Sequence, residues 1–197
     1  MKKKSAQSVI VEDAFYTIAA INGKVLEVAN YNPDDGAAIQ LWDYSGQPWQ
    51  QWRFESVGGG AYRIRNRFTD KAIDLALRGT VAGTLLHQWS PISDSSQQWL
   101  LEPGDQGTRI RSVRAGKCLD LAEMSTANGA RAQIWTDVEG GNQEWIIHRV
   151  PNRRKKKNAD AEDAGEKQAS SRKSRESALL KKIDGTTTKA SKSRKRK

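Results

Sequence analysis

Three acidic residues in this 197-residue chain are each followed, fifteen positions later, by a tryptophan. The pairs are Glu27 with Trp42, Asp74 with Trp89 and Asp120 with Trp135. An indole offers a flat face on which the C–H groups of a pyranose can stack, and a carboxylate accepts hydrogen bonds from two adjacent hydroxyls. Together the two groups could hold a sugar ring. The alternative interpretation is that the tryptophans only cover the core and the acids cap turns.

The same spacing belongs to a longer internal repeat, the first feature to look for in a sequence. Residues 24–52, 71–99 and 117–145 align without gaps, with offsets of 47 and 46. We refer to them as the first, second and third repeats. Each has a glycine nine residues after its acid and closes on Gln-x-Trp; these glycines and closing tryptophans are Gly36, Gly83, Gly129, Trp52, Trp99 and Trp145. Apolar neighbours predict that the closing tryptophans lie in the core, with their partner glutamines bonded to backbone.

The elements that position these residues are expected to be short strands. Residues 16–20 and 62–65 are rich in β-prone types, and pairs such as Asn22-Gly23, Arg78-Gly79 and Asn128-Gly129 indicate turns. A unit of this length with about four strands cannot enclose a core alone, whereas three such units can. A propeller usually needs at least four blades, so the pattern predicts an all-β, closed threefold barrel.

The run 38–42 (AIQLW) and the three Gln-x-Trp closures resemble the ricin B-type lectin domain, a β-trefoil, over residues 15–149. The resemblance implies twelve strands, six in a barrel and six in three capping hairpins. It also implies non-covalent carbohydrate binding in shallow pockets, up to one per repeat. In the family pattern an Asp, a Gln, the exposed Trp and an Asn-Gln pair converge on the sugar.

Matching this pattern position by position separates the three repeats. The third repeat has the full set: Asp120, Gln133, Trp135, Asn142 and Gln143. The second has Asp74, His87, Trp89, Ser96 and Gln97, and the first has Glu27, Gln40, Trp42, Trp49 and Gln50. Ser96 is shorter than the Asn it replaces, Glu27 is one methylene longer than Asp, and Trp49 removes an amide. We therefore rank the third repeat first as a carbohydrate site, the second next and the first as degenerate.

Catalytic and metal chemistry are not expected from these residues. A threefold fold places the three acids on separate lobes, whereas the carboxylate pairs of glycosidases lie about 5–10 Å apart. His87 and His148 have no recognisable nucleophile partner, and Cys118 is the single cysteine, which excludes an internal disulfide and a cysteine-cluster zinc site. No metal and no cofactor is predicted.

The charge is divided between two parts of the chain. Residues 1–151 carry 16 Lys or Arg and 17 Asp or Glu, whereas residues 152–197 carry 17 and 6, and every aromatic residue precedes 146. We expect an extension over 1–14, a trefoil over 15–149 and a disordered basic tail over 150–197. Such a tail can attract nucleic acid or another polyanion without reading sequence.

Two further expectations follow from the composition. No stretch has the roughly 20 apolar residues of a membrane-spanning helix. The basic start, Met1 to Lys4, is not followed by the apolar region of a secretory signal, so we expect a cytoplasmic or otherwise intracellular protein, or one exported by a route that the sequence does not show.

Three function classes remain open from the sequence. The first is a non-catalytic lectin that binds a glycan or glycoconjugate. The second is a nucleic-acid-associated protein whose tail drives binding while the trefoil serves as a protein-interaction scaffold. The third is an enzyme inhibitor, and no specific residue of the sequence supports this class. Fold alone does not decide among them.

Overall fold

A computed structural model describes residues 10–138 and 140–151, and these residues hold twelve short strands. Six of them form a barrel: β1 (Tyr16–Ala19), β4 (Trp52–Gly58), β5 (Ala61–Asn66), β8 (Trp99–Pro103), β9 (Thr108–Ser112) and β12 (Ile146–Arg149). The other six form three hairpins: β2 (Val25–Val28) with β3 (Ile39–Trp42), β6 (Ala72–Leu75) with β7 (Leu86–Trp89), and β10 (Cys118–Leu121) with β11 (Ala132–Trp135). The predicted all-β trefoil is confirmed.

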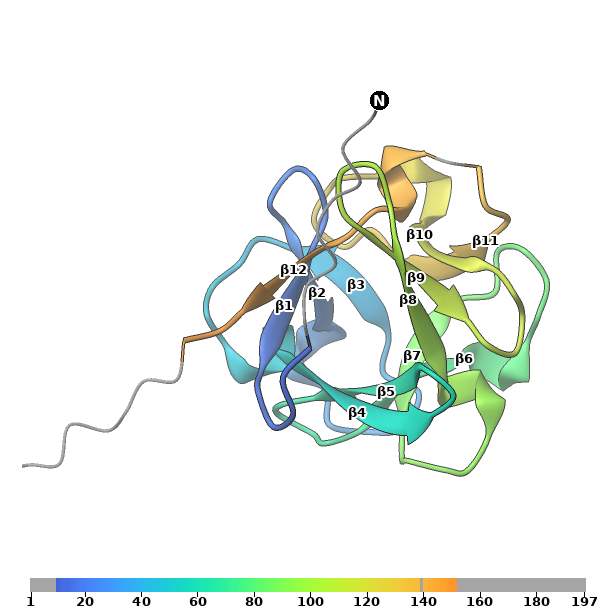
Figure 1. The fold of residues 1–197 in the computed structure, drawn as a ribbon. Coiled ribbons are helices and arrows are strands. Elements are labelled where there is room, and N and C mark those ends of the chain that lie inside the picture. Colours follow the sequence, from blue (N-terminus) through green and yellow to red (C-terminus); the bar gives the residue numbers. More distant parts are fainter. Residues whose placement is uncertain (1–9, 139, 152–197) are drawn as a thin grey trace, which may run out of the picture. The chain divides into compact units, whose positions relative to one another are not determined.

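The barrel is built from three long antiparallel pairs that are joined side by side (Figure 1). β1 pairs with β12, β4 with β5, and β8 with β9. Shorter contacts link the pairs. Tyr16 lies opposite Trp52, two residues of β5 lie opposite two of β8 (Ala61 with Leu100, Tyr62 with Trp99), and a bridge between Thr108 and Trp145 closes the ring. Closure leaves no unpaired edge in the barrel, which is the usual solution to the edge-strand problem.

The hairpins of the three repeats contact one another around the pseudo-threefold axis. Isolated bridges join Ala38 to His87, Leu85 to Gln133, and Gln40 to Arg131. Within each hairpin the register pairs the acid with the residue thirteen positions later, as in Asp120 opposite Gln133. Directly opposite residues in a strand pair point to the same face, so the register alone brings the two side chains together.

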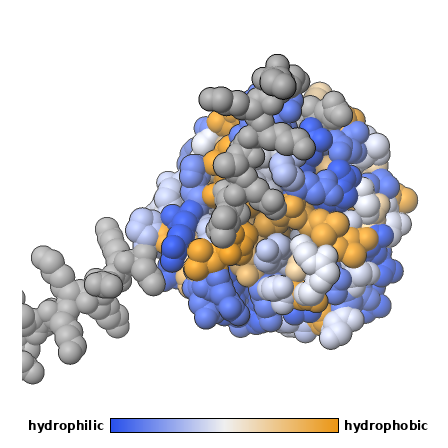
Figure 2. Space-filling view, in the orientation of Figure 1, coloured by the Kyte–Doolittle hydropathy of each residue, from blue (hydrophilic) through white to orange (hydrophobic). Residues whose placement is uncertain are grey.

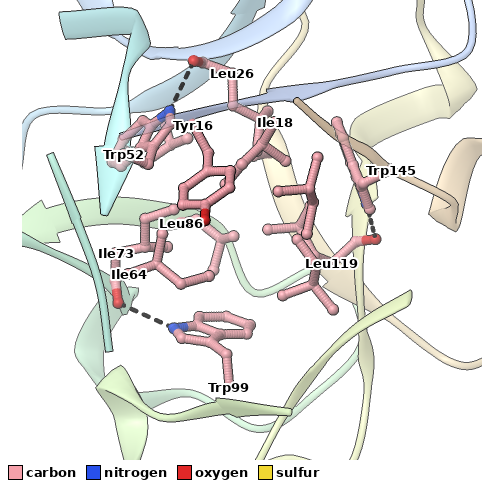
Figure 3. Packing of buried hydrophobic residues seen from close by; sticks show 14 of the residues in the cluster. Tyr16, Ile18, Leu26, Trp52, Ile64, Ile73, Leu86, Trp99, Leu119 and Trp145 are labelled. Atoms are coloured by element: carbon pink, nitrogen blue, oxygen red, sulfur yellow. Dashed lines mark hydrogen bonds between the residues drawn. The ribbon is translucent and has the colours of Figure 1, made fainter. Parts of the chain in front are cut away.

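The closing tryptophans share one role in the core (Figure 3). The indole N–H of Trp52 donates to the Leu26 carbonyl at 3.0 Å. Trp99 and Trp145 make the corresponding bonds at 3.2 and 3.1 Å; their acceptors are the carbonyls of Ile73 and Leu119. All three rings are buried in one hydrophobic cluster, which confirms the predicted core position.

One-turn 3-10 helices connect the strands, and the sequence did not reveal them. Three follow the first strand of each hairpin: η1 (Ala29–Tyr31), η3 (Ala76–Arg78) and η5 (Ala122–Met124). Three precede the closing tryptophans: η2 (Pro48–Gln50), η4 (Ser95–Gln97) and η6 (Gly141–Gln143). In the first group two successive non-glycine residues have positive φ, for example Leu77 at 52° and Arg78 at 54°. The predicted turn does form near Gly79, but Gly79 itself has a φ of −62°. The left-handed conformation, which is unfavourable for bulky residues, is adopted instead by Leu77 and Arg78.

The face of the described part seen in Figure 2 is mostly polar. Figure 2 shows hydrophilic residues around most of the face seen in Figure 1, with hydrophobic residues gathered near its middle, over the barrel strands. No helix among the described residues is long and apolar enough to cross a membrane.

Candidate functional site

The floor of the third-repeat site is Asp120, a buried residue of β10. Gln133 of β11 lies opposite and donates to Oδ1 at 3.3 Å. Asn142 and Gln143, both in η6, donate to Oδ2 at 2.8 and 2.7 Å. The carboxylate therefore receives three amide donors from two separate segments.

Two opposing effects act on this carboxylate. Burial raises the pKa of Asp120 above its ordinary value, and the hydrogen bonds from the amides of Gln143, Gln133 and Asn142 act in the opposite direction. The amides hold the two oxygens in place and favour the ionised form, which is the form that accepts hydrogen bonds.

Trp135 provides the wall of the same site. It ends β11 two residues after Gln133, and 41% of its surface is exposed. A depression of about 550 Å³ is lined by Asp120, Gln133, Trp135 and Asn142. The acid and the exposed indole, which are fifteen residues apart in the sequence, thus line the same depression.

The Gln-x-Trp glutamines lie behind the acids rather than in the depressions. Gln50, Gln97 and Gln143 are fully buried. Gln143 Nε2 donates to Asp120 and to the Thr136 carbonyl, while its Oε1 accepts the Val138 N–H. Gln50 and Gln97 repeat this pattern in their own repeats. The predicted hydrogen bonds to backbone are confirmed. Each glutamine also donates a hydrogen bond to the carboxylate of its own repeat and so orients it.

The second repeat has a smaller depression, about 210 Å³, lined by Asp74, His87 and Trp89. Gln97 donates to Asp74 Oδ2 at 3.0 Å. His87 stacks on Trp89, with 5.3 Å between ring centroids, and burial lowers the pKa of its imidazole. Within the described part, the buried Asp74 Oδ1 and Ser96 Oγ have no hydrogen-bond partner. The replacement of Gln by His and of Asn by Ser therefore leaves this acid with fewer donors.

The first repeat differs most from the other two. Glu27 is buried and accepts hydrogen bonds from Gln40 and Gln50, each at 2.9 Å, so the longer side chain is accommodated. Trp49 stands where the third repeat has Asn142, and its ring packs on Tyr31 at 4.7 Å. Trp42 is 41% exposed, like Trp135. The acid and exposed indole are retained, but an aromatic pair replaces the amide.

Several lining residues were not identified from the sequence. They stand three and four residues after the acid and three after the exposed tryptophan: Leu77, Arg78 and Ile92 in the second repeat, and Glu123, Met124 and Val138 in the third. The repeat alignment contained the signal, because these positions are equivalent in the two repeats. Their outward direction depends on the left-handed turns of η3 and η5, which composition does not indicate.

Each exposed tryptophan also rests on a neighbouring repeat. A side-chain carbon built on Gly83 would lie 3.6 Å from the Trp135 ring, one on Gly36 would lie 3.9 Å from Trp89, and one on Gly129 would lie 4.0 Å from Trp42. The repeat glycine therefore packs against the exposed indole of a neighbouring repeat, in addition to its role as a turn residue.

Other chemistry has little support among residues 10–138 and 140–151. No three His, Cys, Asp or Glu side chains in these ranges are placed to hold a metal ion. Cys118 is buried in β10, and burial raises the pKa of its thiol to about 11, so the reactive thiolate is disfavoured.

A family model described as ricin-type beta-trefoil lectin domain-like matches residues 8–89 and 92–172. No curated protein matches the chain. Among solved structures, the designed threefold-symmetric protein ThreeFoil is 34% identical, with a TM-score of 0.68 over 70% of this chain and 100% of that one. An exo-β-1,3-galactanase from Clostridium thermocellum is 32% identical, with a TM-score of 0.69 over 72% of this chain but 31% of the enzyme.

The C-terminal half of an earthworm R-type lectin, solved in complex with GalNAc, is 25% identical, with a TM-score of 0.58 over 70% of this chain and 99% of that one. The internal repeat, the closed barrel with three hairpins and these matches agree: the chain belongs to the ricin-type β-trefoil lectin domain-like family.

Proposed function

We propose that the protein is a non-catalytic carbohydrate-binding module whose principal site is the third repeat. The observation that carries the proposal is that Asp120 and Trp135 line one depression, in which amide donors orient the carboxylate and the indole is exposed. Asp120 and Asn142 would bond two adjacent hydroxyls, while the ring stacks on the apolar face of the sugar. Gln133 and Gln143 hold the carboxylate.

The second repeat is proposed as a further, weaker site, formed by Asp74, His87 and Trp89. The first repeat is proposed not to bind, because the Trp49 ring, tilted 55° against that of Tyr31, stands where an amide is needed. Shallow sites give weak single-site affinity, so several sites on one polymeric glycan would strengthen binding by multivalency.

Two similar proteins suggest which sugars to test first. The earthworm lectin was solved with GalNAc, and the Clostridium thermocellum enzyme is named for galactan. Galactose and GalNAc are therefore the first probes for this chain, as an extension from those proteins.

A non-catalytic role is favoured by the separation of the acids. Glu27, Asp74 and Asp120 belong to different repeats, and each is bonded to amides of its own repeat. A glycosidase needs two carboxylates on opposite sides of one bond.

A glycan array with the full chain tests the proposal. We expect signals on galactose-type glycans that fall strongly in Asp120→Ala and Trp135→Ala, to no more than the weaker binding of the second repeat, with both variants checked for folding by circular dichroism. A folded wild-type protein that gives no signal on any glycan would contradict the proposal and favour the scaffold alternative.

The basic tail lies outside the described residues, so its predicted disorder and polyanion binding stay predictions. The charge of residues 152–197 favours an accessory contact with nucleic acid or another polyanion. The test compares duplex DNA binding by the full chain with a variant in which residues 153–157 are all Gln. Steep salt dependence that is lost in the variant supports the contact, and equal binding by both proteins contradicts it.

A further inference from the structure

The second and third sites have the same kind of buried acid, Asp74 or Asp120, but differ in charge at the edge of the depression. We call the two residues that stand three and four positions after the acid the rim of each site. Both have a buried acid and an exposed tryptophan, and an apolar residue, Ile92 or Val138, follows each tryptophan by three positions. The residues three and four after the acid differ: Leu77 and Arg78 line the second depression, whereas Glu123 and Met124 line the third.

The backbone presents these rim residues in the same way in both repeats. Leu77, Arg78, Glu123 and Met124 all have positive φ, between 52° and 59°. Leu77 and Met124 are among the most exposed large hydrophobic residues of the described part, and Arg78 and Glu123 are exposed as well. Because the turn is equivalent, the difference between the two rims is one of side-chain chemistry.

The charge of Arg78 is only partly compensated by its neighbours. Arg78 lies 3.9 Å from Asp94, but Arg114 lies 3.4 Å from the same carboxylate. Asp94 also accepts the backbone N–H of Ser96 at the start of η4. Two guanidinium groups thus share one acid beside the second depression, whereas Glu123 adds a negative charge beside the third.

We propose that the second site selects a saccharide bearing an anionic substituent, a carboxylate or a sulfate, and that the third site selects a neutral one. This inference rests on the proposed function. Arg78 is the specificity-determining residue: its planar guanidinium can pair with a carboxylate through two parallel hydrogen bonds. The floor acids Asp74 and Asp120 repel an anion at both sites, so the difference between sites comes from the rim.

Site-resolved titration of the full chain tests the proposal. The indole N–H signals of Trp89 and Trp135 in ¹⁵N-correlated NMR spectra, assigned with Trp89→Phe and Trp135→Phe, report the two sites separately. The probes are galactose, galacturonate and galactose 6-sulfate. Relative to galactose, we expect galacturonate to bind the second site about tenfold more favourably than the third, with a preference that weakens as salt is added.

Exchange of the rims provides the decisive variants. L77E/R78M gives the second site the rim of the third, and E123L/M124R does the reverse. The ratio of galacturonate to galactose affinity should fall at the Trp89 signal in the first variant and rise at the Trp135 signal in the second. Arg149→Met removes a positive charge outside both depressions and controls for net charge; it should leave both ratios unchanged.

The outcomes separate this inference from the proposed function. If neither galactose nor any neutral glycan shifts either indole, the lectin proposal fails. If galactose binds but the acid-to-neutral ratio is the same at both sites, or follows Arg149→Met as closely as the rim exchange, only the rim assignment fails. A preference for galacturonate alone supports paired hydrogen bonds from Arg78, whereas an equal preference for the sulfate supports recognition of charge.

Discussion

Asp120 illustrates a conflict between stability and binding at the scale of one residue. Burial raises the pKa of its carboxyl, so the folded protein favours the protonated form more than the unfolded chain does. The stability that this group contributes is therefore full below its unfolded pKa and is lost as the pH rises through its folded pKa. At neutral pH the ionised Asp120 therefore stabilises the fold less than the protonated acid would, although the ionised form is the one that sugar hydroxyls require.

The first prediction concerns Asp120→Asn. An amide of the same shape removes the buried charge but replaces one acceptor oxygen by a donor that faces an amide N–H, so the two effects oppose each other and we expect the melting temperature to change by less than about 3 °C. Affinity at the third site should fall at least about tenfold, because hydrogen bonds to a charged acceptor are lost. Asp74→Asn is the matched control and should spare the third site. A clear drop in melting temperature would show that Asp120 serves folding instead.

The second prediction concerns pH. Because the pKa of Asp120 lies above its ordinary value of 3.8, affinity at the third site should be full at neutral pH and begin to decline while the pH is still above 3.8. Titrations followed at the Trp135 indole between pH 7 and about 4 measure this decline. Affinity that stays constant over the whole range would mean that the ionised carboxylate is not required.

At the scale of elements, each repeat glycine links two neighbouring repeats. Gly83 has a φ of 89° and lies under the Trp135 ring, and its N–H donates to the Ile134 carbonyl. The third site is therefore assembled from the third repeat and the turn of the second. The sequence pattern identified the glycine as a turn residue, but the contact with the next repeat depends on the hairpins meeting at the axis.

The third prediction separates these two roles. Gly83→Val and Gly23→Val both place a branched side chain at a φ near 85–90°, so each should be destabilised by about 1–3 kcal/mol. A side chain on Gly23 meets no atom within 4 Å, whereas one on Gly83 meets Trp135. Only Gly83→Val should weaken sugar binding at the third site, measured at conditions where both variants are folded. Equal binding losses in the two variants would mean that the contact between Gly83 and the Trp135 ring has no role in sugar binding.

The features that recur in all three repeats could be predicted from the sequence. The three copies indicated the barrel core, because Trp52, Trp99 and Trp145 could be recognised as equivalent, and their equivalent bonds to backbone bear this out. The pairing of Asp120 with Gln133 likewise follows from strand register. The rims could not be predicted, because Leu77 and Glu123 face the depressions through left-handed turns that bulky residues rarely adopt.

At the scale of the whole described molecule, the three repeats share one hydrophobic core and a ring of junctions. Residues of all three repeats belong to a single buried cluster. Polar contacts reinforce two junctions: Asn128 bonds Asp43, and Asp35 bonds Ser90. The equivalent pair at the junction beneath the third site is Ala82 and Thr136, where alanine has no such group. The third-repeat site, which has the full set of polar residues, thus lies at the junction that lacks this polar contact between repeats.

The last prediction tests whether the shared core makes the trefoil one cooperative unit. Trp99→Phe and Trp89→Phe make the same substitution in the second repeat, but Trp99 is buried and bonded to the Ile73 carbonyl, whereas Trp89 is 38% exposed. Loss of buried volume and an unpaired carbonyl should cost Trp99→Phe about 2–4 kcal/mol. Trp89→Phe should change stability by less than about 1 kcal/mol and mainly weaken the second site.

Because no repeat can enclose the core alone, the loss in Trp99→Phe should be felt by all three repeats. Thermal melts followed by far-ultraviolet circular dichroism and by the Trp135 indole signal should coincide at one lowered midpoint, although Trp135 lies in another repeat. If the Trp135 signal kept its wild-type midpoint while the circular dichroism signal melted in two steps, the repeats would be folding independently and would not depend on a common core.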